Sequence, residues 1–451
     1  MENRKNKKKY RTYNTMRITA LAVAAGLIIS LGGCADKKTQ NSYTGEKNEE
    51  PVYQDNLNAV SPSVYSHTDG LNLEPGTYIS VIGKEESSAY WKTVKAGVMQ
   101  AAEDLNKALG YKGADKIKVT FNAPAKSEDF NEQVNILDEE MGRDPDVIAI
   151  ACIDETAYTV QFDMATDNGI PIIALDSGNA YPGIQCTVGT DNNDAARTGA
   201  YKLADEIGGS GEVILLVHDS TSESAKEREA GFCEKISESY QDVTIAETIY
   251  CDRLEDLKKA IAEEKNAELE EGEKEFSADS MSDEEVIQYY IWKHPEVKGI
   301  FGTNVNAVRL GLSAVKVEGR AVSADQKDTT EESGQEADKE TEKETVQEAD
   351  EETSGEDSGK ETEAEAETEE EEKQPIVLVG FDGGEEQIDS LRKGEIAGLV
   401  IQNPFGIGYA SVIAAARTVL QIGNEAEVNT GYIWVTCENL DSASIQNMLY
   451  E

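Results

Sequence analysis

Polar residues that can hydrogen-bond a small ligand follow four apolar segments of the sequence, each at the point where the segment ends. They are Asp176 after residues 172–175, Asn304 after 299–303, Asp382 after 379–381 and Gln402 after 399–401. Ligands of open α/β proteins bind beyond the carboxyl ends of the parallel strands, so these side chains should meet at one site. Carboxylate and amide groups bind the hydroxyls of a sugar ring. Taken singly, each residue could instead cap a helix.

An aromatic pair, Tyr90 and Trp91, follows the first apolar segment within Ser87-Ser88-Ala89-Tyr90-Trp91. Aromatic rings can pack against the C–H faces of a sugar, which complements the polar groups at its edge. The pair therefore favours a sugar site, whereas the alternative for Trp91 is a place in the core.

The segments that would position these residues alternate between short apolar runs and helical patterns of about 10–15 residues. The alternation begins at Thr77 and restarts after a break near residues 189–192. Alternating strands and helices indicate parallel sheets covered on both faces. Two doubly wound, Rossmann-like α/β lobes fit the number of segments better than one very wide sheet.

The first residues have the pattern of an export signal. Seven basic residues precede an apolar run over 18–31, which is too short to span a bilayer, so residues 1–33 are predicted to be a signal peptide. Leu31-Gly32-Gly33-Cys34 resembles the bacterial lipobox, in which the cysteine is lipidated and anchors the protein to the outer face of the cell membrane. An ordinary signal peptide with an incidental cysteine is the alternative. The polar residues 34–76 are predicted to be a flexible spacer behind this anchor.

The net charge of −46 is unevenly distributed. Residues 323–373 hold 23 acidic and five basic residues and almost no aliphatic ones, so we predict a disordered acidic insertion there. It joins a helix to a strand and should lie away from the ligand site, as a solvated loop or as a contact to divalent cations or the cell wall. Such a chain is a poor partner for nucleic acid.

Catalytic and metal-binding motifs are lacking in the sequence. We find no GxSxG, no HExxH and no phosphate-binding glycine loop, which argues against an enzyme. The five cysteines after Cys34 show no CxxC spacing, which argues against a disulfide framework and a zinc site. We therefore predict no cofactor and no metal.

Seven segments in a fixed order resemble the ribose/galactose-type periplasmic sugar-binding proteins, the type I periplasmic binding protein family. They are residues 87–91, 170–177, 188–192, 226–232, 299–304, 379–383 and 401–404. The resemblance implies an N-terminal lobe of residues 77–190 plus 403–431 and a C-terminal lobe of 191–402 plus 432–451, joined by a three-stranded hinge. Ser177 stands where ribose binders have an arginine, which argues against ribose itself.

The resemblance also implies roles for individual residues. Tyr90 and Trp91 would stack on the sugar, Asp176 and Arg228 would grip its hydroxyls, and the remaining ligand contacts would come from Ser88, Asp154, Asp252, Asn304, Asp382 and Gln402. The implied function is an extracytoplasmic, monomeric lipoprotein that delivers a monosaccharide or sugar derivative to an ABC permease. The alternative is a receptor of the same fold, coupled to a sensor kinase or a chemoreceptor.

Overall fold

The computed structural model describes residues 51–270, 273–321 and 374–450, all of which belong to one compact unit. The expected signal peptide (1–33), the lipidation site Cys34 and the acidic insertion (323–373) lie outside the described residues. Within the described ranges, no helix has both the length and the apolar character needed to cross a membrane.

The first lobe is built on a six-stranded sheet in which every neighbouring pair is parallel. In spatial order the strands are β11 (Glu427–Asn429), β5 (Ile184–Gly189), β4 (Ile172–Leu175), β3 (Val147–Ile150), β1 (Tyr78–Ile82) and β2 (Lys118–Asn122). The helices of this lobe are α2 (Ala89–Leu109), α3 (Phe130–Gly142), α4 (Thr159–Asp167) and α12 (Pro404–Leu420). Strands β1, β3 and β4 are buried along their whole length, as expected for a sheet covered on both faces.

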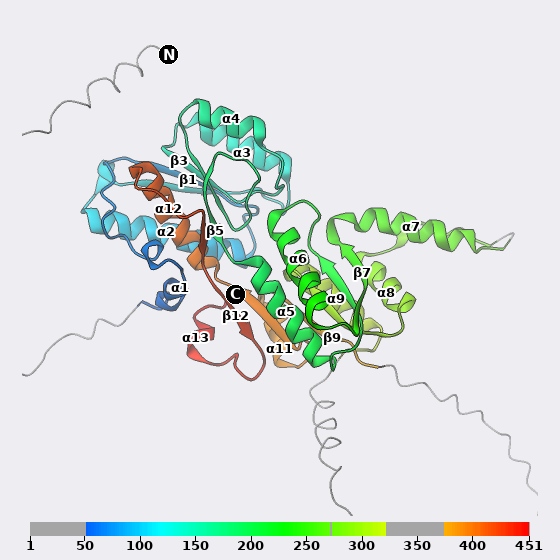
Figure 1. The fold of residues 1–451 in the computed structure, drawn as a ribbon. Coiled ribbons are helices and arrows are strands. Elements are labelled where there is room, and N and C mark those ends of the chain that lie inside the picture. The colour runs from blue at the N-terminus through cyan, green and yellow to red at the C-terminus, as the bar shows by residue number, and fades with distance from the viewer. Residues whose placement is uncertain (1–50, 271–272, 322–373, 451) are drawn as a thin grey trace, which may run out of the picture. The chain divides into compact units, whose positions relative to one another are not determined.

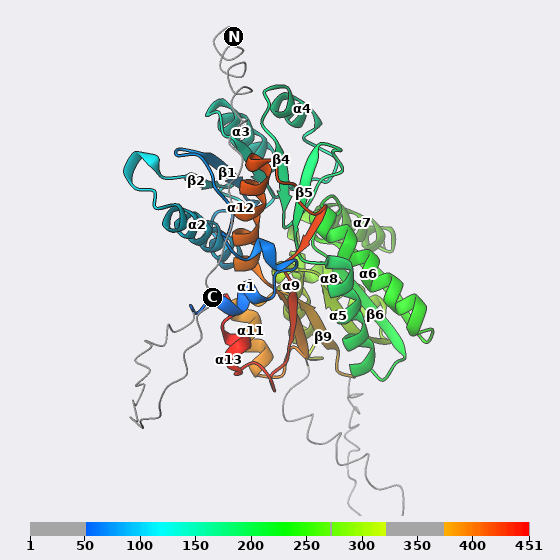
Figure 2. The same cartoon turned by 60° about the vertical axis from the view of Figure 1, so that its left-hand side comes forward.

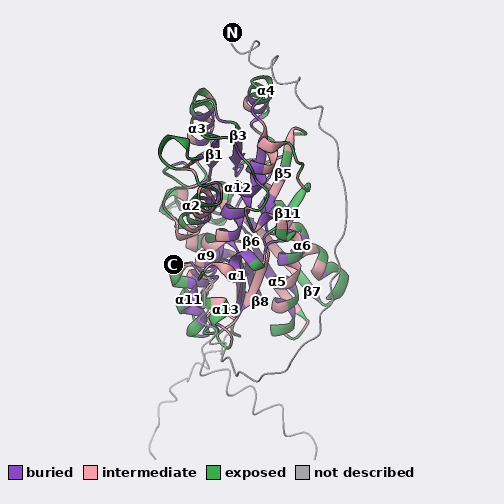
Figure 3. Cartoon of the chain, turned by 90° about the vertical axis from the view of Figure 1, so that its left-hand side faces the viewer, coloured by how far each residue is buried: buried purple, intermediate pink, exposed green. Residues whose placement is uncertain are grey.

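The second lobe repeats this plan with one antiparallel edge. Its strands are β12 (Tyr432–Val435), β10 (Gly398–Gln402), β9 (Val377–Phe381), β8 (Val297–Gly302), β6 (Gly211–Val217) and β7 (Val243–Tyr250). Its helices are α5 (Asn192–Glu206), α6 (Glu223–Ser239), α7 (Leu254–Ala267), α8 (Asp283–Lys293), α9 (Val305–Val317) and α11 (Glu385–Arg392). The fold class predicted from the sequence, two doubly wound α/β lobes, is confirmed. Figure 3 shows the buried strands inside each sheet and the exposed outer faces of the helices.

The chain passes between the two sheets three times: from β5 to α5, from β10 to α12 and from β11 to β12. Asn403, which is fully buried, joins two of these crossings because its Nδ2 donates to the carbonyl of Thr430 at 2.8 Å. The same nitrogen donates to the carbonyl of Asn56 at 2.7 Å. The Asn403 side chain therefore connects two of the three crossing segments with residue 56 near the start of the first lobe.

Helices α2 and α12 pack closely although they come from opposite ends of the sequence, as Figures 1 and 2 show. A Cβ on Gly408 would lie 2.0 Å from the carbonyl oxygen of Val94, and one on Gly97 would lie 2.1 Å from that of Phe405. The two glycines therefore allow the helix backbones to touch. This contact fixes the late helix α12 in the first lobe.

The predicted flexible spacer is wrong for residues 51–76. They form α1 (Gln54–Asn58) and a short 3-10 helix (Ser63–Tyr65), and pack on the first lobe. Leu57, Tyr65 and Leu73 are buried in the same apolar cluster as α12. The segment has few apolar residues, but these contact α12, so burial of a few side chains is enough to fix it.

Candidate functional site: the cavity between the lobes

A cavity of about 850 Å³ lies between the carboxyl ends of the strands of the two lobes. All ten ligand-binding residues predicted from the sequence line it: Ser88, Tyr90, Trp91, Asp154, Asp176, Arg228, Asp252, Asn304, Asp382 and Gln402. Small-molecule sites have volumes of about 300–1,000 Å³ and place a few polar groups in an otherwise apolar wall. The cavity has this size, but most of the residues that line it are polar or charged, which suits a polar ligand.

Two aspartates occupy equivalent positions in the two lobes, Asp176 after β4 and Asp382 after β9. Both have a left-handed backbone, with φ of 61° and 69°. Each donates its backbone N–H to the adjacent strand, Asp176 to Val188 O and Asp382 to Val400 O, both at 2.8 Å. Aspartate tolerates this conformation better than most residues, and such positions concentrate at functional sites.

Tyr90, near the start of α2, lines the cavity and contacts residues of both lobes. Its hydroxyl donates to Oδ1 of Asp176 and lies 3.5 Å from Oε1 of Gln402 in the hinge. Burial and the neighbouring Asp176 raise the pKa of Tyr90 well above its ordinary value, so the phenol keeps its proton and remains a donor.

Trp91 lines the cavity but is only 6 % exposed. Its indole ring meets Tyr90 edge to face at a centroid distance of 5.4 Å and lies 6.5 Å from Phe121. Most of the ring therefore belongs to the core of the first lobe, and little of it is available to a ligand.

Arg228 reaches the cavity from α6 and is 3 % exposed. Its Nε donates to Oδ1 of Asn192 at 2.9 Å and its Nη1 to the carbonyl of Thr303 at 2.7 Å. The guanidinium also lies 4.2 Å from the ring centre of Phe381. These contacts hold a flat, five-donor group in one orientation, which suits recognition of adjacent oxygens on a ligand.

Four of the ten residues hold the local loop geometry as well as lining the cavity. Ser88 and Asn304 cap α2 and α9 by accepting from Trp91 N at 3.3 Å and Ala307 N at 2.9 Å. Asp154 accepts from Thr156 N at 2.8 Å, and Asp252 accepts from Ser220 Oγ at 2.7 Å. Their backbone positions are therefore fixed without the ligand.

Lys84 lines the cavity and was not found from the sequence, although it is the second residue after β1. It is 4 % exposed. Burial alone would lower the pKa of Lys84, but the carboxylates of Glu128, Asp219 and Asp176 outweigh this and raise it. The ammonium group therefore stays charged and offers a further donor at the cavity wall.

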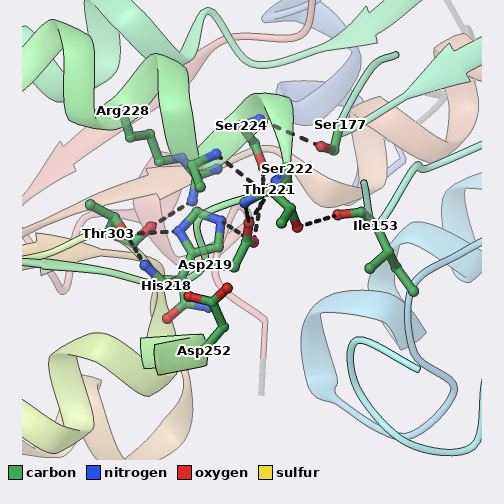
Figure 4. Close-up of polar contacts among 12 residues, drawn as sticks. Ile153, Ser177, His218, Asp219, Thr221, Ser222, Ser224, Arg228, Asp252 and Thr303 are labelled. Carbon is green, nitrogen blue, oxygen red and sulfur yellow. Dashed lines mark hydrogen bonds and ion pairs between the residues drawn. The ribbon is translucent and has the colours of Figure 1, made fainter. Parts of the chain in front are cut away.

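His218 and Asp219, after β6, form a second group that sequence reasoning missed (Figure 4). The backbone N–H of His218 donates to Oγ1 of Thr303 at 2.9 Å, and its Nε2 lies 3.5 Å from Oδ2 of Asp219. Burial lowers the pKa of His218, and although the neighbouring Asp219 opposes this, the positive charges of Arg228 and Lys84 add to it. The imidazole is therefore neutral at physiological pH.

Direct contacts cross from one lobe to the other at the edge of the cavity, as the close-up in Figure 4 shows in part. Oγ1 of Thr221 donates to the carbonyl of Ile153 at 3.4 Å, and the Ser224 N–H donates to Ser177 Oγ at 3.5 Å. Farther out, Nζ of Lys226 lies 2.6 Å from Oε2 of Glu155. The described conformation is thus one in which the lobes touch.

Five cysteines are present in the described ranges, at 152, 186, 233, 251 and 437, and all are free thiols there. Within the same ranges, no group of three or more His, Cys, Asp or Glu side chains is placed to hold a metal ion.

Residues 79–424 match the family described as the periplasmic binding protein domain. The chain belongs to the periplasmic binding protein family. Among curated members, a D-ribose/D-allose-binding protein of Pseudomonas aeruginosa is 25 % identical over 225 residues. This alignment covers 49 % of the present chain and 62 % of the Pseudomonas protein.

Solved periplasmic binding proteins share the two-lobed fold. A carbohydrate transporter solute-binding protein from Agrobacterium radiobacter, in complex with D-arabinose, aligns with a TM-score of 0.56 and 22 % identity, over 83 % of this chain and 98 % of that one. An ABC transporter solute-binding protein from Agrobacterium vitis with bound D-fucose gives 0.58 and 20 %, over 83 % and 100 %. At these identities the likeness concerns the fold.

Proposed function

We propose that this chain is an extracytoplasmic solute-binding protein that captures a monosaccharide or close sugar derivative in the cavity between its lobes and delivers it to an ABC permease. In this proposal the protein acts as a monomer, is held at the membrane by a lipid on Cys34, and binds its ligand without chemical change. The observation that carries the proposal is the gathering of all ten predicted ligand residues around one cavity.

The chemistry of the cavity suits a polyhydroxylated ring. Asp176 and Asp382 supply acceptors, Lys84 and Arg228 supply donors, and Gln402 supplies both. Tyr90 adds an aromatic surface beside them. Hydrogen bonds to charged groups contribute about 1.5–3 kcal/mol each, so a few such bonds account for specific binding of a small neutral ligand.

The ligands of related proteins also favour a sugar. The curated relative is named for ribose and allose, and the two solved relatives hold arabinose and fucose. The interlobe contacts of Thr221, Ser224 and Lys226 support a mechanism in which the closed state differs in surface from the open one. A permease that recognises the closed state would receive only loaded protein.

The proposal is tested by a thermal-shift screen of the purified protein against monosaccharides, polyols and nucleosides, followed by calorimetry. A ligand that binds only the native fold raises the melting temperature according to its concentration relative to Kd. We expect a stabilising sugar with micromolar affinity. Stabilisation by nucleosides alone, or by none of these compounds, would contradict a sugar-binding function.

A further inference from the structure

Residues 437–450, which follow β12, bring a tyrosine to the ligand cavity. The segment contains the short helix α13 (Ala443–Gln446), and its residues Leu440 and Tyr450 are buried in the apolar cluster of the second lobe. Tyr450 is 3 % exposed and lines the cavity. Nothing in the sequence pattern marks this residue as part of a site.

Tyr450 contacts one proposed ligand residue from each lobe. Its hydroxyl donates to Oδ1 of Asp382 at 2.9 Å and accepts from the backbone N–H of Gly383 at 3.2 Å. Its ring meets that of Tyr90 edge to face at a centroid distance of 5.6 Å. The side chain is thereby fixed at three points.

Among the described residues, the side chains that donate to the Asp382 carboxylate share one of its oxygens. Nε2 of Gln402 donates to the same Oδ1 at 2.8 Å, so both protein donors reach one oxygen. Oδ2 can then accept from a ligand hydroxyl. The hydrogen bonds from Gln402 and Tyr450 thereby fix the orientation of the Asp382 side chain.

The same segment is tied to the first lobe. Nδ2 of Asn447 donates to Oδ2 of Asp55 at 2.9 Å. Asp55 lies in α1, whose Leu57 is buried in the core of the first lobe. The segment 437–450 therefore contacts both lobes beside the hinge.

We propose that Tyr450 is a positioning residue of the ligand site, which fixes the Asp382 carboxylate and the Tyr90 ring in the arrangement that binds the sugar. This inference rests on the proposed function, because it assigns Asp382 and Tyr90 to ligand binding. It makes residues 437–450 an integral part of the site.

The charged and titratable groups around Asp382 are Arg228, Asp176, Tyr90 and Tyr450. Burial raises the pKa of Asp382, while Arg228 and the hydrogen bonds from Gln402 and Tyr450 lower it. Removing the Tyr450 hydroxyl therefore raises this pKa further. In the variant, acidification therefore protonates Asp382 at a higher pH than in the wild type. Sugar binding that needs the charged carboxylate is then lost at that higher pH.

The test compares Tyr450→Phe with a matched control, Tyr409→Phe. Tyr409 is 2 % exposed and donates to Oδ2 of Asp104 at 3.0 Å, but it lies in α12 and does not line the cavity. Calorimetry from pH 4 to 8 measures the affinity for the sugar found in the screen, thermal melting checks folding, and carbon-13 NMR follows the titration of Asp382 in the free protein.

We expect Tyr450→Phe to weaken binding about 10- to 30-fold at pH 7, the lower part of the range for one hydrogen bond to a charged group, because the Asp382 carboxylate itself remains. In Tyr450→Phe, the pH below which the affinity falls and the pH at which Asp382 titrates should both be higher than in the wild type. Tyr409→Phe should change neither. If Tyr450→Phe matches Tyr409→Phe in affinity and pH profile while the wild type binds sugar, the inference is overturned and the proposed function stands. If the wild type binds no sugar, both fall.

Discussion

Glu227 offers a prediction about stability that needs no ligand. It lies on α6 beside the first hinge crossing, where its Oε2 accepts from Nδ2 of Asn192 at 3.1 Å. Burial raises the pKa of Glu227 to about 7; the hydrogen bond from Asn192 and the charge of Arg228 oppose this rise, whereas the nearby carboxylates of Glu223 and Glu427 add to it. Between pH 4.5 and 7 the folded protein therefore holds a proton that the unfolded chain has released.

The sign and size of the effect follow from this difference. Because the folded state binds more protons in this window, the free energy of unfolding falls as pH rises from about 4.5 to about 7. A difference of about 2.5 pH units corresponds to about 3.4 kcal/mol. Glu227 is only partly buried, and solvent screening reduces this to about 1–2 kcal/mol.

Glu227→Gln keeps the acceptor for Asn192 and removes the charge. We expect this variant to equal the wild type in stability near pH 4.5 and to be about 1–2 kcal/mol more stable at pH 8, as measured by urea unfolding at both values. The control Glu263→Gln removes an exposed negative charge from α7. The reasoning is refuted if Glu227→Gln gains nothing at pH 8, or if Glu263→Gln gains equally, since total charge would then be responsible.

Three further predictions concern the site and its surroundings. Trp91→Ala should destabilise the protein by about 3–5 kcal/mol in urea unfolding, because most of the indole is core; unchanged stability with lost sugar affinity would instead make it a ligand contact. Lys226→Met removes the ion pair with Glu155 between the lobes and should weaken sugar binding about two- to fivefold, because the closed state is less stable. The control Lys259→Met should not weaken it, because its partner Asp256 lies on the same helix. Equal effects of the two variants in calorimetry would exclude a role for the pair between the lobes. Deletion of residues 323–373 should leave the sugar affinity unchanged. The flanking residues Ala321 and Ile376 pair at the start of β9, whereas Asp382 follows the other end of this strand. A large loss of affinity would place the deleted segment at the site.

Local rules were sufficient to predict the fold class and to place six residues at the cavity, namely Tyr90, Trp91, Asp176, Asn304, Asp382 and Gln402. Ser88, Asp154, Arg228 and Asp252 were placed there by the family resemblance. Apolar runs followed by helical periodicity specify βαβ units, and parallel strands bring their carboxyl ends to one edge. The same rule, applied to β1 and β6, also selects Lys84, His218 and Asp219, so these three could have been found.

Two features could not be predicted because they depend on contacts between distant parts of the chain. Asn56 and Asn403 are 347 residues apart, yet their side chains bond at 3.0 Å. The polar composition of residues 51–76 gives no indication of such packing. Tyr450 likewise reaches the cavity because residues 437–450 fold back onto the second lobe, which no periodicity indicates.

The central claim, that a sugar is bound between the lobes by the strand-end carboxylates, is tested most directly by calorimetry of Asp176→Asn beside the wild type. This substitution keeps the size of the side chain but replaces a charged acceptor with a neutral amide. We predict that the variant melts as a folded protein and that its Kd is about 10- to 150-fold higher, the equivalent of one lost charge-assisted hydrogen bond. An unchanged Kd for the sugar would contradict the assignment of the cavity as the binding site.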